Sequence, residues 1–268
     1  MKNYYIGIMS GTSMDGIDAV LAEISDDGQT AVLCHKDVPF EKTLKNTYFD
    51  LQAPSQNELH KEALAANHLA QHYHLACTAI LQEAKLQPSD ISAIGAHGQT
   101  IRHQPQAHDG IGYTKQSLNP ALLAELTGID VIADFRSRDI AAGGQGAPLV
   151  PAFHAAQFGC NEDLAILNIG GIANLSLIPA HQQEKIIGFD CGPGNVLLDH
   201  WIQQSLGQSF DDDGQWAAKG QLIQKLLSSM LNDDYFKKAP PKSTGRDLFN
   251  PEWPVSYTHL RAHETKAN

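Results

Sequence analysis

The stretch that sets the fold reads Ile6-Gly-Ile-Met-Ser-Gly-Thr-Ser-Met-Asp-Gly-Ile-Asp-Ala-Val-Leu21, and it predicts an apolar strand, a tight polar turn and a second apolar strand. Gly11 and Gly16 permit backbone angles that other residues avoid, and they let a ligand approach the main chain. The N–H groups and hydroxyls of the turn can surround an anion. Because the Asp15 carboxylate would repel a bare phosphate, it fits such a site only beside a metal ion. The alternative is an ordinary hairpin.

The composition indicates a globular protein. The chain has 268 residues, enough for two domains, and is 42% hydrophobic and 18% charged. Its net charge of -11 argues against binding to nucleic acid or to an anionic membrane, but not against a nucleotide held locally. We expect a cytoplasmic protein, because the sequence shows no signal peptide and no apolar run that could span a bilayer. The four cysteines lie far apart with no C-x-x-C pair, which is typical of cytoplasmic thiols.

A long helix and a polar segment follow the predicted hairpin. Ser55 precedes Glu58 by three residues, which predicts a helix start, and apolar residues at helical spacing continue it to about Ala84. His68 and His72 lie four apart on this helix, where a solvated polar face is the alternative to a metal site. A short buried strand over 92–96 then leads into the polar segment 97–103. Its candidate ligand residues for hydroxyls or a carboxylate are Gln99, Arg102 and His103, and the alternative is a structured loop with His97 satisfied internally.

A glycine-rich loop occupies residues 141–148, directly after a predicted strand over 129–133 that ends in the charged segment 134–139. Three glycines surround Gln145, so the loop permits close approach of a ligand. Its position after a charged strand end favours a site, although a linker between domains is the alternative. Between these segments, Asn119-Pro120 and Gly128 predict the start and stop of a helix.

The second half of the chain repeats the opening pattern. Residues 164–169 and 172–178 predict two strands joined by the glycine turn Gly170-Gly171, with Asn174 supplying a polar group near it. A strand–glycine turn–strand pattern that occurs twice, about half a chain apart, is explained most economically by a duplicated α/β domain with a cleft between the copies.

Asp190 follows a predicted strand over 185–189 and precedes a predicted helix over 196–206 that stops at Gly207. A carboxylate at the end of a strand and beside a helix N-terminus suits a general base or a metal ligand, and the N–H groups near Gly194 can bind an anion. The alternative is a helix cap. A helix is predicted over 221–231, and the basic loop 242–246 has no predicted role.

Five motifs resemble the anhydro-N-acetylmuramic acid kinase family in content and order: Ser10–Asp18, Ala96–Ile101, Ala141–Pro151, Asn168–Asn174 and Phe189–Asn195. The resemblance covers about Tyr5 to Trp253. It implies an actin/hexokinase-like (ribonuclease H-like) α/β fold with duplicated domains and ATP in the cleft. On this basis residues 1–139 form the first domain, residues 140–253 form an incomplete second domain, and residues 254–268 form a non-native tail.

The resemblance also implies the reaction. The enzyme opens 1,6-anhydro-N-acetylmuramic acid with water and phosphorylates the freed O6 with ATP and Mg²⁺, which serves peptidoglycan recycling in the cytoplasm. Asp190 is then the general base for the water, and Asp15 holds Mg²⁺ directly or through water. The nucleotide-binding residues are Gly11, Thr12, Ser13, Met14, Asp15, Gly16, Ile17, Asp18, Gly170 and Gly171. The sugar-binding residues are His97, Gln99, Gly144, Gln145 and Asn174.

Three departures from the family pattern accompany this resemblance. Cys191 stands where the family usually has threonine, so a hydroxyl donor is lost. Family members continue beyond the stretch that matches Trp253. They have a Gly-rich segment that holds adenosine and a final helix, and neither is present in this sequence. The segment 255–265 does not match the family and looks like a translated sequencing adapter. We therefore expect poor solubility and little kinase activity from this exact chain.

Two alternative functions remain open at the level of sequence. One is a different activity on the same fold, either a sugar kinase without ring opening or an ATPase regulator. The other is a non-catalytic protein that binds a sugar or a nucleotide, or an inactive fragment of the enzyme. The family resemblance implies a homodimer, and a small-molecule substrate is the only other partner that we expect.

Overall fold

The computed structural model describes residues 3–11, 14, 16–180 and 184–264, with the backbone alone over 259–264. The chain divides into two compact units, Met1–Gly146 and Ala147–Asn268, and each is described by itself. Among the described residues, no helix is both long enough and apolar enough to cross a membrane.

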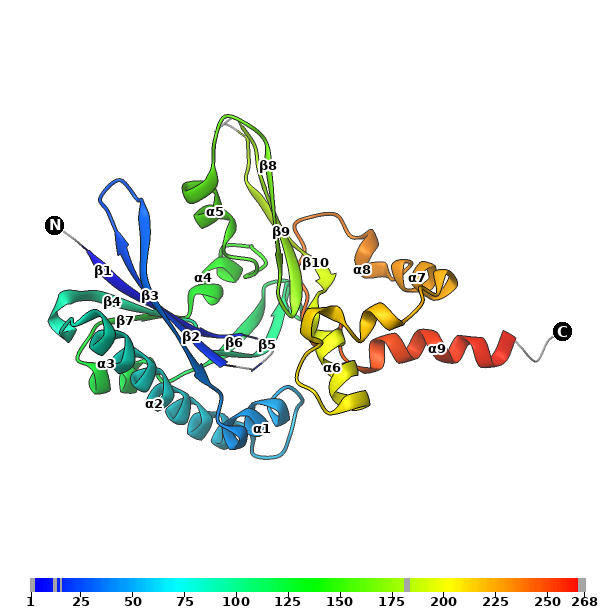
Figure 1. Cartoon of the computed structure of the whole chain (residues 1–268), viewed down its shortest axis with the longest axis horizontal. Coiled ribbons are helices and arrows are strands. Elements are labelled where there is room, and N and C mark those ends of the chain that lie inside the picture. Colours follow the sequence, from blue (N-terminus) through cyan, green and yellow to red (C-terminus); the bar gives the residue numbers. More distant parts are fainter. Residues whose placement is uncertain (1–2, 12–13, 15, 181–183, 265–268) are drawn as a thin grey trace. The chain divides into compact units, whose positions relative to one another are not determined.

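The first unit is built on a five-stranded mixed sheet in the order β3-β2-β1-β4-β7 (Figure 1). The predicted opening hairpin is confirmed, because β1 and β2 pair antiparallel with Gly7 opposite Val20. β4 and β7 add parallel strands beside β1, which confirms a mixed α/β architecture. The strands are β1 (Tyr4–Ser10), β2 (Gly16–Ile24), β3 (Thr30–Pro39), β4 (Ile91–Ala96) and β7 (Val131–Ala133).

Two helices, α2 (Glu58–Ala84) and α3 (Pro120–Thr127), lie along one face of this sheet (Figure 1). Most of the apolar residues predicted at helical spacing on α2 are buried, since Leu69, Tyr73 and Ile80 are fully inaccessible. Leu59, at the start of the predicted series, is 83% exposed. Burial of each inaccessible side chain contributes about 1.5–3 kcal/mol, so this stripe fixes the helix on the sheet. The remaining helices of the unit are α1 (Lys42–Asp50), the short η1 (Pro88–Asp90) and α4 (Phe135–Ala141).

The predicted helix boundaries follow from local chemistry. Asn119 caps α3 by accepting the Leu122 N–H at 3.0 Å, and Gly128 ends the helix with a positive φ of 68°. At α2, Glu58 accepts the Ser55 N–H at 3.4 Å, but the capping box predicted from Ser55 does not form. The residue at the cap position is Asn57, so the helix begins at Glu58 itself.

Most of the polar segment after β4 is a strand, and not the structured loop that the sequence left open as an alternative. β5 (Gln99–Pro105) pairs antiparallel with β6 (Gly112–Ser117) in a two-stranded ribbon. Cross-strand hydrogen bonds between polar side chains, such as Gln116 Nε2 to Thr100 Oγ1 at 3.2 Å, replace the apolar alternation that normally marks a strand. The charged segment 134–139 likewise falls mostly in a helix, α4.

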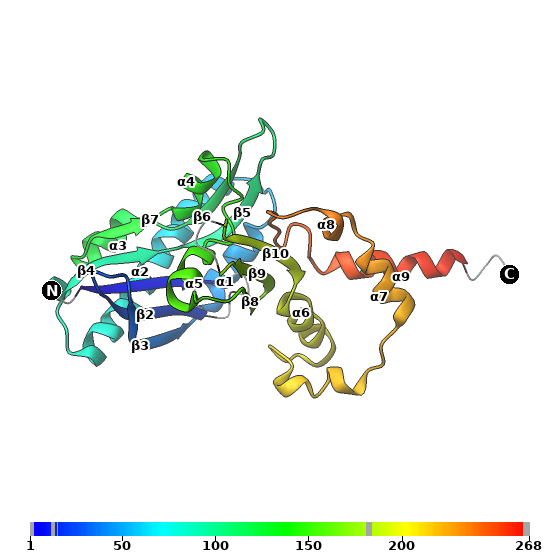
Figure 2. The ribbon, with the colours of Figure 1, turned by 90° about the horizontal axis from the view of Figure 1, so that it is seen from above.

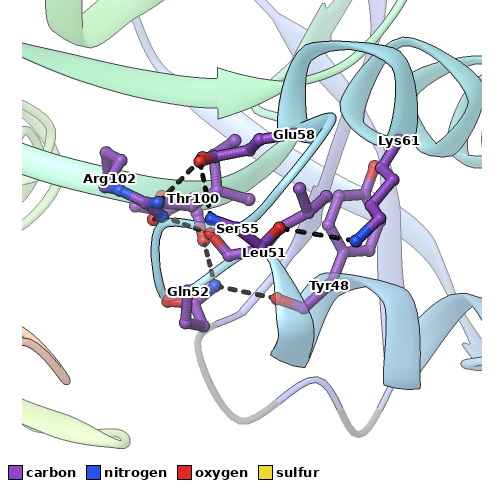
Figure 3. Close-up of polar contacts among 9 residues, drawn as sticks. Tyr48, Leu51, Gln52, Ser55, Glu58, Lys61, Thr100 and Arg102 are labelled. Atoms are coloured by element: carbon purple, nitrogen blue, oxygen red, sulfur yellow. Dashed lines mark hydrogen bonds and ion pairs between the residues drawn. The ribbon is translucent and has the colours of Figure 1, made fainter.

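Arg102 fastens the segment between α1 and α2 to the ribbon. Its guanidinium donates to the Leu51 carbonyl and to Glu58 Oε1, the latter at 2.7 Å. Gln52 Nε2 donates to the Thr100 carbonyl at 3.1 Å, so two β5 residues hold this segment (Figure 3). Arg102 therefore has a structural role in place of the ligand-binding role that the sequence left open.

The second unit contains a three-stranded antiparallel sheet in the order β10-β9-β8. The predicted strand–glycine turn–strand is confirmed by β8 (Leu164–Ile169) and β9 (Ile172–Ile178). β10 (Ile187–Pro193) runs into α6 (Asn195–Leu206), as Figure 2 shows. The other helices of the unit are α5 (Pro151–Phe158), the short η2 (Asp212–Gly214) and η3 (Ala217–Lys219), α7 (Gln224–Leu231), α8 (Asp234–Lys237) and α9 (Glu252–Glu264).

An aromatic cluster joins α8 to the segment that precedes α9. Tyr235 meets Phe249 edge-on with ring centroids 5.4 Å apart, and Phe249 meets Trp253 at 4.9 Å. Both Tyr235 and Phe249 are buried. Edge-to-face aromatic pairs add about 0.5–1.5 kcal/mol each beyond their buried area. The cluster therefore holds α8 against the segment that leads into α9.

Candidate functional site

The turn of the opening hairpin is tightly built. The Met14 N–H donates to the Gly11 carbonyl at 3.2 Å, and Met14 adopts a left-handed φ of 53° while its side chain is buried. A Cβ on Gly16 would lie 2.3 Å from Asp37 Oδ1, so a larger residue there would displace the Asp37 carboxylate. Thr12, Ser13 and Asp15, which the sequence predicts to bind nucleotide and metal, lie outside the described residues.

Ile17 and Asp18, also predicted to bind nucleotide, lie on β2 just after the turn. Ile17 is 1% exposed and belongs to the apolar core of the unit. The Asp18 carboxylate points to solvent and contacts His35 Nε2 at 3.1 Å. The two side chains therefore face opposite sides of the sheet, as alternation along a strand requires.

Gln99 lies beneath the same turn. Its Nε2 donates to the Gly11 carbonyl at 3.3 Å, so the start of β5 supports the backbone of the hairpin. The side chain is fully buried, and Oε1 has no hydrogen-bond partner among the described residues. A buried acceptor without a partner costs free energy and requires an explanation. A donor from a bound ligand supplies one.

His97 is held as a neutral imidazole. Arg136 Nε donates to His97 Nε2 at 2.9 Å, so the ring proton sits on Nδ1, which donates to the Gly98 carbonyl at 2.7 Å. Burial, and secondly the Arg136 charge, lower the pKa of His97 to about 4. At neutral pH the ring therefore carries no charge, and its orientation is fixed at both nitrogens.

The glycine-rich loop is folded onto the end of α4. The Gly144 N–H donates to the Asp139 carbonyl at 2.8 Å, and the Gly146 N–H donates to Asp139 Oδ2 at 2.7 Å. A Cβ on Gly144 would lie 2.2 Å from the same carboxylate oxygen, which explains the glycine. Arg136 donates to the Gly146 carbonyl at 2.6 Å, and a hydrogen bond joins His103 to the Gln145 backbone. The loop is thus tied to α4 and β5, and Arg136 connects it to His97.

In the second unit the turn Gly170-Gly171 packs against the start of α6. The Gly170 carbonyl accepts the Asn195 N–H at 2.8 Å, and the Gly171 carbonyl accepts the Gly194 N–H at 2.9 Å. The Val196 N–H also donates to Gly171, at 3.2 Å. The expectation that the N–H groups near Gly194 bind an anion is therefore wrong, because the turn carbonyls already accept these donors.

Asp190 lies within β10 and not beyond its end, which corrects the expected strand boundary. The side chain is 5% exposed. Its Oδ2 accepts the Thr244 N–H at 2.9 Å, its own N–H donates to the Lys242 carbonyl at 3.0 Å, and its carbonyl accepts the Tyr235 hydroxyl at 2.8 Å. Asn174 stands opposite on β9, with its Oδ1 buried and lacking a partner among the described residues.

Four residues at these sites have no role in the sequence-based predictions: Arg136, Tyr235, Lys242 and Thr244. Arg136 belongs to a charged run whose members look alike in sequence, and only the fold shows which one reaches His97. The basic loop 242–246 lies more than fifty residues beyond Asp190, so no local pattern links the two. The sequence signal that could have marked this loop as functional is its combination of lysine, hydroxyl residues and glycine.

The described residues contain no group of three or more histidine, cysteine or acidic side chains that could hold a metal ion. His72, one of the paired histidines on α2, contacts Glu41 Oε2 at 3.2 Å. All four cysteines are free thiols, as their spacing predicts.

Comparison with known proteins identifies the family. The family model for "Anhydro-N-acetylmuramic acid kinase" matches residues 3–268. The anhydro-N-acetylmuramic acid kinase of Cupriavidus pinatubonensis is 59% identical over 250 residues, covering 93% of this chain and 66% of that protein. The protein of the same name from Variovorax paradoxus is 56% identical over 253 residues, covering 93% of this chain and 67% of its own length.

The chain spans about two thirds of the length of these relatives. Among solved structures, an exopolyphosphatase-like protein matches 88% of this chain and 60% of its own with a TM-score of 0.40 and 10% identity, too weak a likeness to decide the finer fold. The sequence identity decides the family. This chain belongs to the anhydro-N-acetylmuramic acid kinase family.

Proposed function

We propose that the protein converts 1,6-anhydro-N-acetylmuramic acid, water and ATP to N-acetylmuramic acid 6-phosphate and ADP. Water attacks C1, the bond from C1 to the bridging O6 breaks, and O6 takes the γ-phosphoryl group of ATP. The water proton passes to a general base, and its oxygen stays on C1. Family membership over 93% of the chain supports this reaction.

Asp190 is the proposed general base, and its setting is the observation that carries the proposal. A carboxylate that is 5% exposed is costly to bury unless hydrogen bonds satisfy it, and Thr244 supplies one such bond. A base needs a fixed position within hydrogen-bond reach of the water that it deprotonates. The buried partnerless Oδ1 of Asn174, on the facing strand, supports a sugar contact beside this base.

The remaining proposed roles follow the family motifs. His97, Gln99, Gly144 and Gln145 contact the sugar, supported by the neutral and oriented His97 ring and by the partnerless Gln99 Oε1. The nucleotide phosphates lie against Gly11–Asp18 and Gly170-Gly171. Asp15, which lies outside the described residues, would hold Mg²⁺, and the metal would neutralise charge on the phosphates. The protein works in the cytoplasm as a homodimer.

The finer fold is proposed to be actin/hexokinase-like, with a first domain over 1–139 and a second domain that starts at residue 140. Two similar meanders support the duplication. In the first unit β1, β2 and β3 pair antiparallel in chain order, and in the second unit β8, β9 and β10 do the same. In each, a glycine-containing turn joins the first two strands.

The Asp190→Asn variant tests the proposal in the full-length protein. The amide keeps the size of the side chain but cannot take a proton, so turnover falls by at least about 10²-fold while the affinity for the anhydro sugar changes little. Steady-state kinetics and calorimetric titration measure the two. The control is Asp213→Asn, an exposed carboxylate at a left-handed φ of 56°, which keeps wild-type turnover. Wild-type turnover in Asp190→Asn would refute the assignment, and sugar binding without any turnover in the wild type would favour a binding protein.

A further inference from the structure

One short stretch of chain bonds the N–H, the carbonyl and the Oδ2 atom of Asp190. β10 is an edge strand in the order β10-β9-β8, and the segment 235–244 bonds to Asp190 there. The segment accepts the Asp190 N–H, donates to the Asp190 carbonyl and donates to the carboxylate, at distances from 2.8 to 3.0 Å. The peptide on both sides of Asp190 and the side chain itself are therefore fixed by the same element.

A strand irregularity lies at the same place. The pairing of β10 with β9 shifts between Asp190 and Gly192, so Cys191 is an extra residue in the strand. Such a bulge interrupts the ladder and re-aims the neighbouring side chain. A strand that is locally released from its partner needs another anchor, and the segment 235–244 provides it.

Lys242 ties this anchor to α8. Its ammonium donates to the Tyr235 carbonyl at 3.1 Å and lies 4.7 Å from the centre of the Tyr235 ring. The Tyr235 hydroxyl in turn reaches Asp190, so Lys242 contacts Asp190 through its backbone and Tyr235 through its side chain. Tyr235, Lys242 and Asp190 each contact the other two. These contacts restrict the movement of β10 relative to α8.

We propose that Tyr235, Lys242 and Thr244 form a clamp that positions the Asp190 carboxylate for proton transfer, an inference that rests on the proposed function. This Asp190 clamp gives the basic loop 242–246 its role. Its members are positioning residues, because they act through Asp190. The Thr244 N–H favours the ionised carboxylate over the protonated form, since only the ionised form accepts that bond at full strength.

Three titratable groups on different elements of the described chain lie near Asp190. The Lys242 ammonium approaches from the loop, the Tyr235 hydroxyl from α8, and the Cys191 thiol is the next residue of β10. Burial, and secondly the Asp190 charge, raise the pKa of the Cys191 thiol. Burial, and secondly the Asp190 charge, also raise the pKa of Tyr235. Both groups therefore stay neutral at pH 7, and the acidic limb of the rate profile reports the carboxylate.

The decisive comparison is Thr244→Pro against Thr244→Ala in the full-length protein. Proline removes the N–H that bonds Oδ2, whereas alanine removes the side chain and keeps that N–H. In Thr244→Pro we expect kcat to fall on the order of 10²-fold with little change in KM, and the acidic limb of the kcat profile to move up by roughly one pH unit. Thr244→Ala keeps the wild-type limb. An unmoved limb in a folded Thr244→Pro, or equal shifts in both variants, would overturn the clamp.

A second variant tests the Asp190 clamp if circular dichroism shows that Thr244→Pro does not fold. Tyr235→Phe keeps the ring and removes the hydroxyl that bonds the Asp190 carbonyl. It should lower kcat roughly 3- to 10-fold at unchanged KM. Tyr113→Phe, at an exposed ring, is the control and leaves kcat unchanged. A wild-type kcat in Tyr235→Phe contradicts the clamp.

Failure of the clamp and failure of the proposed function give different results. If Asp190→Asn is inactive but neither clamp variant changes the rate or its pH profile, Asp190 is the base and the clamp is wrong. If Asp190→Asn keeps wild-type turnover, the proposed function of Asp190 is wrong, whatever the clamp variants show.

Discussion

His97 shows how a single side chain couples the fold to pH. It is buried, and an arginine donates to its Nε2, so the folded protein binds no proton there until about pH 4. His103 behaves in the same way, since burial and secondly the Arg136 charge lower its pKa to about 4. Both histidines accept a proton near pH 6.5 once the chain unfolds.

The two lowered pKa values determine how the free energy of unfolding changes with pH. Between about pH 6.5 and pH 4 the unfolded chain binds protons that the folded chain does not, so the free energy of unfolding declines as the pH falls through that window. His97→Asn removes one of the two groups and flattens the decline, although it also lowers stability at pH 7 by losing hydrogen bonds. The urea midpoint measured from pH 7 to pH 4 tests this.

His60→Asn is the matched control for that titration, because His60 is exposed on α2. The slope of stability against pH should stay at the wild-type value in this variant. Equal slopes in wild type and His97→Asn would show that His97 does not titrate as its surroundings require.

At the scale of elements, the segment between α1 and α2 depends on one arginine of β5. Arg102→Met removes the bonds to the Leu51 carbonyl and Glu58, leaving a partly buried carboxylate without its cation. We expect a loss of about 1–3 kcal/mol in the free energy of unfolding and faster amide hydrogen exchange over residues 51–57.

The control for that prediction is Lys115→Met on the neighbouring strand β6. Lys115 pairs with Glu62 at 3.4 Å, and its side chain is 49% exposed, so the pair contributes at most about 1 kcal/mol. This variant should leave exchange over residues 51–57 unchanged. The same exchange rates in Arg102→Met and wild type would contradict the role given to Arg102.

The elements that the sequence predicts well are those with local signals. α2 shows a buried stripe at helical spacing, and α3 has an asparagine cap and a terminal glycine. The hairpins β1–β2 and β8–β9 have apolar strands around glycine turns. β5 escapes prediction because its polar side chains find partners on β6 and on α2. These partners are distant in sequence, so no local pattern predicts them.

The same distinction governs the candidate site. Asp190, His97 and the loop 141–148 stand in distinctive motifs and are found from sequence. Arg136, Tyr235 and Thr244 touch them only after folding, across separations of 39, 45 and 54 residues for their bonds. The anion site expected near Gly194 fails for a similar reason, because the Gly170-Gly171 carbonyls reach it from another strand pair.

At the scale of the whole molecule, two compact units each carry an antiparallel meander with a glycine-containing turn, and each contains residues with proposed roles. The first contributes the hairpin, Gln99 and the neutral His97. The second contributes Asp190, Asn174 and the Asp190 clamp. Membership of the anhydro-N-acetylmuramic acid kinase family makes ring opening by water the central claim about this molecule.

The most direct test is turnover of the anhydro sugar with ATP in heavy-oxygen water, followed by mass spectrometry of the product. We expect one heavy oxygen, located at C1, and none in the phosphate group, with Asp190→Asn giving no product. Preformed N-acetylmuramic acid 6-phosphate incubated in the same water corrects for spontaneous exchange at C1. A phosphorylated product without excess label at C1 would contradict the account, because the water would then not have opened the ring.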